Sequence, residues 1–560
     1  MADSANLTLA LRALEEKMEQ MKADFEENNN AFFMCSMALI IFFMQCGFAF
    51  LEAGAVRSKN TTNILIKNVL DSIIVIFCYW ATGWAFAYGD DNGDGNIFIG
   101  TSQFFLSGQS DFPKFFFQYV FTATASTIVS GAVCERCEFI TYIVYCSFIS
   151  MFVYPVLTHW GWSHHGWMAK GIDAGNASTT YIDFAGSGVV HLCGGTISFI
   201  AAYMIGPRIG RFPAKRDEDP SPEIQGHSVP FAALGGFILM FGFLAFNGGS
   251  TANITEPHIG NTVALAMINT IMSGSFAAIV YILIFYVSNG KWTLLLTINA
   301  ALTGMVSACA GCNNTMPWGS VVTGTGAGLI YLVLSKLMIK LKIDDPLDAF
   351  AVHAGGGIWG LISVCIISRG GIAYSIVDAI NGDGSHVGPA FAQLGWNALS
   401  ALAIIVWSTV TMIPAFFILK KLNLFRVAPE VEIKGLDIYK HGEAAYPIHA
   451  YGHGWDEITS PAGKKISALA EVSIEELAEA YERKTSVLPA IDSRKISFFH
   501  NKERYEHPEN HQRALKERQN GTSQNRFGGE TPVAQGPVLG INVTGRSTPD
   551  YLDRRGQWER

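Results

Sequence analysis

The sequence predicts an all-α polytopic membrane protein, and two observations lead to that fold class. Of the 560 residues, 49% are hydrophobic and only 15% are charged, whereas soluble domains carry about 25% charged residues. Apolar blocks of about 20 residues, the length that a helix needs to cross a bilayer core, dominate the chain from Ala31 to Leu422. The formal net charge of −8 lies mostly in loops and tail, so it identifies no partner, and nothing in the pattern indicates nucleic acid binding.

Eleven membrane spans can be placed along these apolar blocks. Their expected ranges are 31–56, 64–88, 114–133, 139–157, 183–206, 229–247, 260–287, 293–311, 317–339, 347–368 and 391–420. Lys and Arg concentrate in alternate short loops, for example at Arg57, Arg136 and Arg208, while the other loops hold little beyond Lys170 and Arg369. Positively charged loops stay in the cytoplasm. This rule predicts an N-terminus outside and a C-terminus inside, as an odd number of spans requires.

Spans one to five and six to ten show the features of an internal repeat. Gly47–Gly54 (GFAFLEAG) in span one resembles Phe241–Gly248 (FGFLAFNG) in span six. Because five is odd, the second repeat must be inverted in the membrane. Inverted repeats are typical of transporters, whose substrate sites lie near the bilayer midplane at the repeat interface.

Two histidines occupy matching places in this repeat. His191 follows Asp183 by eight residues in span five, and His353 follows Asp348 by five residues in span ten. Eight residues of helix advance about 12 Å, and the two spans enter from opposite sides, so the imidazoles are expected to meet in mid-membrane. Ionisable groups inside a membrane are costly and indicate function.

The segment before the first span, residues 1–30, carries an apolar seam. The spacing alternates between four and three residues, which is the pattern of a coiled coil; the residues are Leu7, Leu11, Leu14, Met18, Met21 and Phe25. A coiled coil outside the membrane is one interpretation, and an amphipathic helix packed elsewhere on the protein is the other. The organisation expected is therefore residues 1–30, a transmembrane domain over 31–422, and a cytosolic regulatory tail over 423–560 whose distal part is disordered because it lacks apolar periodicity.

The cysteines do not predict a metal site. Cys134 and Cys137 form one CxxC unit, and Cys309 and Cys312 form another. Two CxxC units can bind zinc together, but the predicted topology puts them on opposite faces of the membrane. No cofactor is expected.

Three segments resemble the Amt/Mep/Rh ammonium transporter superfamily, most closely its plant-type Amt branch. Asp183–His191 (DFAGSGVVH), continuing to Arg208, is similar to the signature of that family, and Asp344–His353 (DDPLDAFAVH) to its second histidine motif. Phe246–Ser250 (FNGGS) resembles its external-site segment. The resemblance extends from about residue 31 to Tyr446. It implies a homotrimer of eleven-helix subunits, each with its own pore, and ammonium or ammonia as substrate, with methylammonium also taken up.

The resemblance also implies roles for particular side chains. Trp162, Ser250, Phe117 and Phe121 would recruit ammonium at an external site, because aromatic faces attract cations and a hydroxyl accepts an N–H. Phe121 and Phe246 would stack below it as a gate that excludes water. Asp183 is expected to cap span five and to favour a nearby cation; direct contact with the substrate is the other interpretation.

Below the gate, His191 and His353 are expected to form a twin-histidine pore. Neutral imidazole offers one hydrogen-bond donor and one acceptor, so two neighbouring rings can pass ammonia or relay its proton. In the tail, Glu432–Glu443 (EIKGLDIYKHGE), which includes Gly435, resembles the cytosolic regulatory motif of the family. Plant members carry a phosphorylatable Thr where this chain has Tyr439, so threonine phosphorylation is excluded at that position.

These features together predict an ammonium transporter of the plasma membrane. One alternative is a sensor that binds ammonium at the same site and signals through its tail, although no output domain is evident. Another is an Rh-type channel for ammonia or carbon dioxide, which Trp162 disfavours because Rh members usually lack that aromatic. An enzyme is not expected: Asp183 and His191 stand two helical turns apart, too far for a simple shared metal shell.

Overall fold

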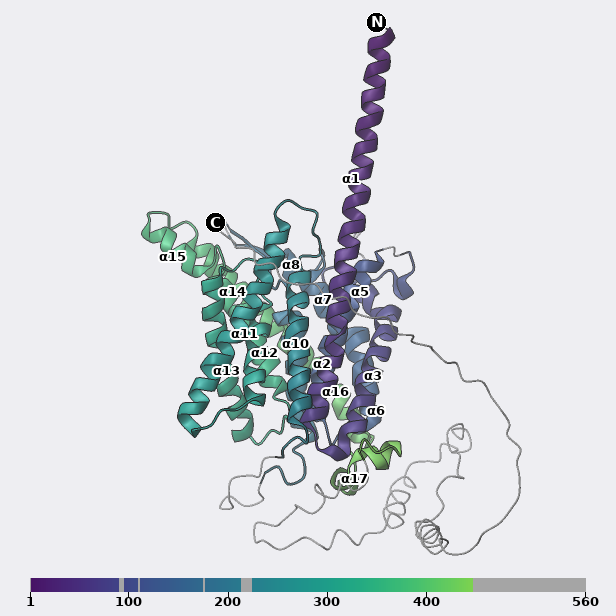
Figure 1. Cartoon of the computed structure of the whole chain (residues 1–560), viewed down its shortest axis with the longest axis vertical. Coiled ribbons are helices and arrows are strands. Elements are labelled where there is room, and N and C mark those ends of the chain that lie inside the picture. The colour runs from purple at the N-terminus through teal and green to yellow at the C-terminus, as the bar shows by residue number, and fades with distance from the viewer. Residues whose placement is uncertain (1, 90–94, 109–110, 175–176, 213–223, 447–560) are drawn as a thin grey trace, which may run out of the picture. The chain divides into compact units, whose positions relative to one another are not determined.

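The computed structural model describes residues 2–89, 95–108, 111–174, 177–212 and 224–446. By its internal contacts the chain divides into two units, residues 1–472 and 473–560. The second unit, and with it the tail segment predicted to be disordered, lies outside the described residues. The first unit is predominantly helical (Figure 1).

The first half of the helical unit contains α-helices, short 3-10 and π-helices (η) and one small hairpin. In chain order these are α1 (Ala2–Phe42), α2 (Met44–Ala55), η1 (Ser58–Asn60), α3 (Thr61–Cys78), η2 (Tyr79–Gly83), α4 (Trp84–Tyr88), η3 (Phe104–Leu106), α5 (Phe112–Val133), α6 (Phe139–Phe148), η4 (Ile149–Val153), α7 (Tyr154–Trp162), α8 (Trp167–Lys170), β1 (Ile172–Ala174), β2 (Ala177–Thr179), η5 (Ser187–Leu192) and α9 (Cys193–Ile205). The strands β1 and β2 are antiparallel, and Ile172 pairs with Thr179.

The second half is helical throughout its described elements. These are α10 (Val229–Gly249), α11 (Ile259–Asn289), α12 (Leu295–Ala308), α13 (Pro317–Lys340), η6 (Phe350–Gly355), α14 (Gly356–Ile367), α15 (Ile372–Ile380), α16 (Val387–Lys421), α17 (Pro429–Lys434) and η7 (Asp437–His441).

Ten helical stretches in the described part of the chain are long and apolar enough to cross a membrane. The eleventh predicted span, 293–311, forms α12, which has only 14 residues and falls short of the roughly 20 that a straight crossing needs. The span predicted over 183–206 also differs, because its helix begins at Ser187 and its first turns are a π-helix. Asp183 therefore precedes the helix, whereas the sequence placed it inside.

The outer faces of the long helices remain apolar. On α3 the exposed side chains Val69, Ile73 and Phe77 are spaced by four residues, so they form one stripe along the helix. A similar stripe follows α16 through Leu402, Val406 and Val410. Exposed apolar surface of this extent is typical of a protein that contacts lipid.

The helix α1 is much longer than a single span. It is continuous from Ala2 into the first apolar block, and Figure 1 shows it as one straight helix. The six seam residues from Leu7 to Phe25 are each more than half exposed. In the single chain, the seam therefore does not pack against the described part of the protein, as the second of the two interpretations required.

Glycines allow α2 and α10 to pack in direct backbone contact. A Cβ atom on Gly54 would overlap the amide nitrogen of Ala232 and lie 2.5 Å from the carbonyl oxygen of Ser228. A Cβ on Gly235 would overlap the nitrogen of Leu51 and lie 2.5 Å from the oxygen of Gly47. Small residues at such crossings let van der Waals contacts drive helix association in a membrane.

We therefore expect Gly235→Val to destabilise the protein, because the added atoms must push apart two backbones that cannot move independently. Overpacking of this kind costs about 1–3 kcal/mol. Thermal unfolding of the detergent-solubilised protein measures the effect. The matched control is Gly260→Val, since no atom lies within 4 Å of a Cβ at Gly260. Equal melting temperatures for the two variants would contradict the packing argument.

Candidate functional site

Two phenylalanine rings from different helices stack in the interior of the bundle. Phe121 on α5 and Phe246 on α10 have ring centroids 4.1 Å apart and planes inclined by 23°. Both are buried almost completely. Phe117, one turn before Phe121 on α5, lies 4.9 Å from it between centroids. The stacked pair closes the space between α5 and α10 with hydrocarbon.

Trp162 reaches the same group of rings from the end of α7. Its indole meets Phe121 edge to face, with centroids 6.0 Å apart, and its N–H donates to the carbonyl oxygen of Asp183 at 2.8 Å. This hydrogen bond fixes the tryptophan against the turn that precedes η5. Ser250 follows the last residue of α10, and its hydroxyl donates to the Phe246 carbonyl at 2.8 Å. The oxygen of Ser250 keeps its capacity to accept a hydrogen bond.

The carboxylate of Asp183 is used by the start of the η5 helix. One oxygen accepts from the backbone nitrogens of Gly188 and Val189, at 2.9 and 3.0 Å, and the other from Gly186 at 3.2 Å. The hydroxyl of Tyr181 donates to it as well, at 3.1 Å. The first amides of a helix have no intrahelical acceptor, and here the aspartate supplies one. Asp183 is 5% exposed, so its charge is held by these donors.

His191 and His353 face each other in the bundle interior. Their Nδ1 atoms are 3.2 Å apart, and the rings are nearly parallel, inclined by 16° with centroids 5.2 Å apart. His191 is fully buried and His353 is 8% exposed. His191 also lies 5.5 Å from Phe246 between ring centroids. The side chains thus follow one another from Trp162 through the phenylalanine pair to the two imidazoles.

The hydrogen bond between the rings constrains their protons. If both rings are neutral, one Nδ1 carries a proton and the other accepts it, so the two Nε2 atoms differ: one is an acceptor and the other a donor. Nε2 of His191 is buried and has no protein partner among the described residues. A polar atom left without a partner in an apolar interior costs about 1–3 kcal/mol, which favours a ligand there.

Both histidines lie in π-helices, each followed by an α-helix. His191 belongs to η5, which continues as α9, and His353 belongs to η6, which continues as α14. π-Helical turns are rare and are frequent at functional sites. The two segments cross closely because a Cβ on Gly195 would overlap the Ala354 nitrogen, and one on Gly357 would overlap the Ser187 oxygen. Glycine at these points lets the two imidazoles come within hydrogen-bonding distance.

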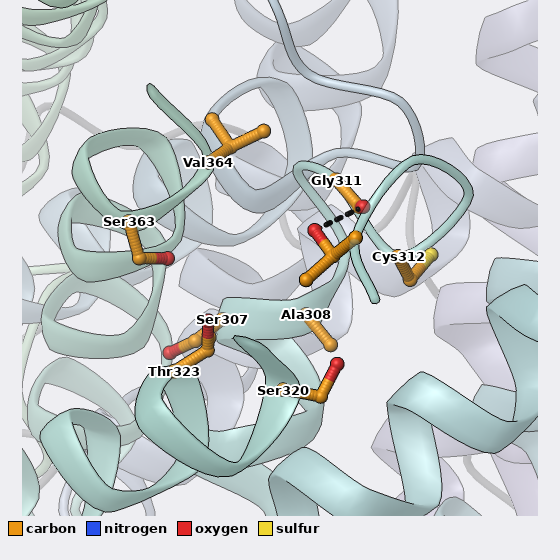
Figure 2. Close-up of a pocket in the computed structure, with 9 residues that line it drawn as sticks. Ser307, Ala308, Gly311, Cys312, Ser320, Thr323, Ser363 and Val364 are labelled. Carbon is orange, nitrogen blue, oxygen red and sulfur yellow. Dashed lines mark hydrogen bonds between the residues drawn. The ribbon is translucent and has the colours of Figure 1, made fainter. Parts of the chain in front are cut away.

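Two small cavities accompany these helices. The first, about 30 Å³, is lined by His353, Glu52 and Asn299 together with apolar side chains, and exceeds the roughly 10–15 Å³ that one water needs. The second, about 10 Å³, lies between α12, α13 and α14. Figure 2 shows the hydroxyls of Ser307, Ser320 and Thr323 around it. At that volume it is at the lower limit for one water.

The tail returns to the helix ends through a buried charge network. Arg208 binds Glu135 at 2.6 Å and Asp344 at 2.8 Å. Burial opposes ionisation of Glu135, but Arg57 and Arg208 outweigh it and hold the pKa of that carboxyl well below its usual value. Glu432 of α17 joins the same surface by accepting from the Ile209 backbone at 2.7 Å and from Arg426 at 2.9 Å.

Gly435 is the point at which α17 turns toward η7. Its φ of +96° lies in the region that favours glycine, and a Cβ there would be 2.6 Å from the Lys59 Cβ. Lys59 donates to the Ile433 carbonyl, and Asn60 accepts from the Leu436 nitrogen at 3.0 Å. Tyr439 is half-buried and packs against the apolar cluster of Val427, Val431 and Leu436. The tail motif is thereby held against the α2–α3 turn.

Sequence reasoning missed two groups that border the histidines. Phe243 lies 5.5 Å from His191 between ring centroids; it stands one turn before Phe246, and this i, i+3 spacing on one helix face could have indicated it. Glu52 was noted only as part of the repeat. Its meeting with the His353 cavity joins α2 to η6 and has no signal in sequence spacing.

Comparison with known proteins agrees with this architecture. A model of the Ammonium Transporter Family matches residues 31–446. The chain is 61% identical over 523 residues to "Putative ammonium transporter 1" of Caenorhabditis elegans, covering 90% of this chain and 98% of that protein. It is 36% identical to "Ammonium transporter 1 member 3" of Solanum lycopersicum, covering 76% and 94%.

A solved structure shares the fold. The structure titled "Sensor Amt Protein" superimposes with a TM-score of 0.67 at 32% identity, covering 75% of this chain and 100% of the other. Its agreement confirms the prediction of a helical, polytopic membrane protein. The family match over most of the chain, together with the worm and tomato relatives, shows that this chain belongs to the ammonium transporter family.

Proposed function

We propose that this protein recruits ammonium at the Trp162 end of the site and conducts ammonia, or ammonium, past the twin histidines. Its membership of the ammonium transporter family supports transport as the activity. The observation that carries the proposed route is the unbroken series of contacts from Trp162 through Phe121 and Phe246 to His191 and His353. Each step of that series joins side chains from different helices.

The external site combines cation attraction with a hydrogen-bond acceptor. Ammonium is a small cation, and each aromatic face that it contacts contributes about 0.5–2 kcal/mol, with Trp the best partner. Trp162, Phe117 and Phe121 would offer such faces, and the Ser250 oxygen would accept one N–H. Asp183 would act mainly through structure, by fixing the η5 helix and the carbonyl that holds Trp162.

The stacked rings and the histidines divide the remaining work. A cation at the bilayer centre costs at least about 3 kcal/mol, so Phe121 and Phe246 would exclude hydrated ions while ammonium gives up its proton. Ammonia then needs hydrogen-bond partners, which the free Nε2 atoms of the imidazole pair provide. The same pair can relay the released proton from one ring to the other.

The surrounding architecture follows from the same proposal. We infer eleven spans with an N-terminus outside, a plasma membrane location, and a homotrimer in which each subunit has its own pore. The domain organisation is 1–30 as an external helix, 31–422 as the transporter and 423–560 as a cytosolic tail. The docked motif around Gly435 and Tyr439 would report the state of the tail to the α2–α3 turn, because both contact the same surface.

A sensor is the second candidate, favoured by one observation. The solved structure with the highest TM-score reported above carries the name "Sensor Amt Protein". A transporter and a sensor would share the external site but differ in flux. An Rh-type gas channel is disfavoured by Trp162, which would bind a cation.

The central prediction is that the protein takes up ammonium and methylammonium and that the histidines set its selectivity. Expression should rescue growth of transporter-deficient yeast on low ammonium. His191→Ala or His353→Ala should lower ammonium current or admit potassium, because the relay is broken and a hydrated cation gains room. His191→Glu should spare transport better, because it keeps a proton acceptor.

Ammonium current and potassium leak are measured in voltage-clamped cells at matched surface expression. His386→Ala is the control, since His386 is exposed in a loop. Wild-type selectivity in all the pore variants would mean that the histidines only pack. No uptake by wild-type protein at the cell surface would favour the sensor.

A second prediction separates the two roles weighed for Asp183. Asp183→Ala should lower the melting temperature more than Asp183→Asn, because alanine leaves three backbone N–H groups without an acceptor, at about 1–3 kcal/mol for each buried group, while Asn keeps one acceptor oxygen. Asp383→Ala, in an exposed loop, is the control. If both Asp183 variants melt like wild type yet lose ammonium affinity, the carboxylate is a substrate ligand.

A third prediction concerns the seam on α1. Replacing Leu11, Leu14 and Met18 with Gln should weaken the trimer in detergent, because three helices would lose their shared apolar core, while uptake by each pore persists. Leu9→Gln with Ala13→Gln, on the opposite face of the helix, is the matched control. Native mass spectrometry across a detergent series measures the trimer. Equal resistance to dissociation in both variants would show that the seam does not join subunits.

A further inference from the structure

Three charged side chains from α2 and α3 are buried together within the bundle. Glu52, Lys67 and Asp71 are each 1% exposed. The Lys67 ammonium lies 2.7 Å from an Asp71 oxygen and 3.9 Å from a Glu52 oxygen. Among the residues that the structure describes, no second cation comes within 4 Å of either carboxylate. Two carboxylates therefore share one ammonium group, and the cluster has an excess of one negative charge when all three are ionised.

Such an arrangement is costly unless the excess charge is used. Removing an ion from water costs several kcal/mol even after relaxation, and pairing offsets this only when the charges balance. Lys67 and Asp71 balance each other at short range. Glu52 is the group whose charge is left over, and an intramembrane ionisable residue is by default a functional candidate.

The excess carboxylate borders the same cavity as a pore histidine. Glu52 and His353 both line the cavity of about 30 Å³, together with Asn299 and apolar side chains. His353 uses Nδ1 toward His191, and its Nε2 makes no hydrogen bond to the described residues. A polar atom that is nine-tenths buried and a carboxylate thus share a space that can hold water.

Glu52 is held rigidly at this position. One of its oxygens accepts from the Asn68 amide at 2.6 Å, and the other from the Ser130 hydroxyl. Ser130 is fixed in turn, since its hydroxyl also lies 2.8 Å from the Thr127 carbonyl. The carboxylate cannot swing toward solvent, and α2 ends three residues later, at Ala55, beside the turn on which the tail motif docks.

From this geometry we propose that Glu52 is a proton-accepting group that takes the proton from the histidine pair through the cavity; the proposal rests on the transport function proposed above. When His353 is protonated on both nitrogens, the bond between Nε2 and its proton breaks and a water in the cavity receives that proton. The water passes another of its protons to a Glu52 oxygen. His353 returns to neutral, the water is unchanged and Glu52 becomes a carboxylic acid.

The excess charge of the cluster explains why this transfer is favourable. Before it, the cluster is negative and attracts a proton from the cavity. After it, Lys67 and Asp71 remain as a balanced pair and Glu52 is neutral. Lys67 acts as a positioning residue, because its ammonium keeps Glu52 from being protonated permanently.

The test compares charge with nitrogen in the same cells. Ammonium-evoked current and uptake of labelled methylammonium are measured under voltage clamp for wild type, Glu52→Gln and Glu52→Asp. Gln keeps the size and hydrogen bonds but cannot accept the proton. We expect the current of Glu52→Gln to fall about tenfold or more, since a positioned proton-transfer group typically contributes roughly 100-fold. Uptake should fall much less, so charge per nitrogen drops, and Asp should restore it.

Two further variants make the comparison decisive. Glu256→Gln removes the same charge from an exposed loop and should leave both measurements unchanged. Glu52→Gln leaves the Lys67–Asp71 pair balanced, so it should reach the surface. If it does not, the variant Glu52→Gln, Lys67→Gln, Asp71→Asn removes every charge of the cluster and tests the same loss of current.

Each outcome assigns the failure to one proposal. Unchanged charge per nitrogen in Glu52→Gln at wild-type surface levels would overturn the proton-accepting role. So would an equal fall of current and uptake, which would make Glu52 a structural or pore-lining group, and so would wild-type uptake without any current. Wild-type protein at the surface with neither uptake nor current would instead refute the transport function.

Discussion

The close crossing of the two histidine-bearing segments is the constraint on which the rest of the site depends. A membrane interior offers no water to an unpaired polar group, so each imidazole needs a partner from protein or ligand. The two rings satisfy one another across 3.2 Å only because Gly195 and Gly357 let η5–α9 and η6–α14 touch through their backbones. Any side chain at those glycines would separate the rings and remove the contact.

The aromatic residues extend this constraint toward the other end of the site. Phe246 stacks on Phe121 and also lies beside His191, so the same ring closes the apolar barrier and borders the first imidazole. Trp162 is tied to the turn at Asp183, whose carboxylate caps the π-helix that carries His191. The position of the tryptophan and the position of the histidine therefore depend on one short segment.

Charge is distributed in the protein according to what can balance it. At the tail-bearing ends of the helices, Arg57 and Arg208 neutralise Glu135, and α17 adds Glu432 to the same surface. These groups form a network with several partners each, as buried ions require. The Glu52, Lys67 and Asp71 cluster is different because its charges do not balance. It is the deviation from the general pattern, more than the presence of charge, that indicates a role in moving protons.

The sequence by itself determined the helical membrane class, through block length and the scarcity of charge, and it pointed to the family through the segments around His191, Ser250 and His353. Those segments work at short range, so their spacing is visible in a linear chain. The count of eleven spans, the orientation and the residue roles stay predictions. Only the tertiary structure decided that η5 and η6 are π-helical, that Phe243 borders His191, and that Glu52 shares a cavity with His353. These depend on helices far apart in sequence and on backbone contacts at glycine, which neither hydropathy nor periodicity encodes.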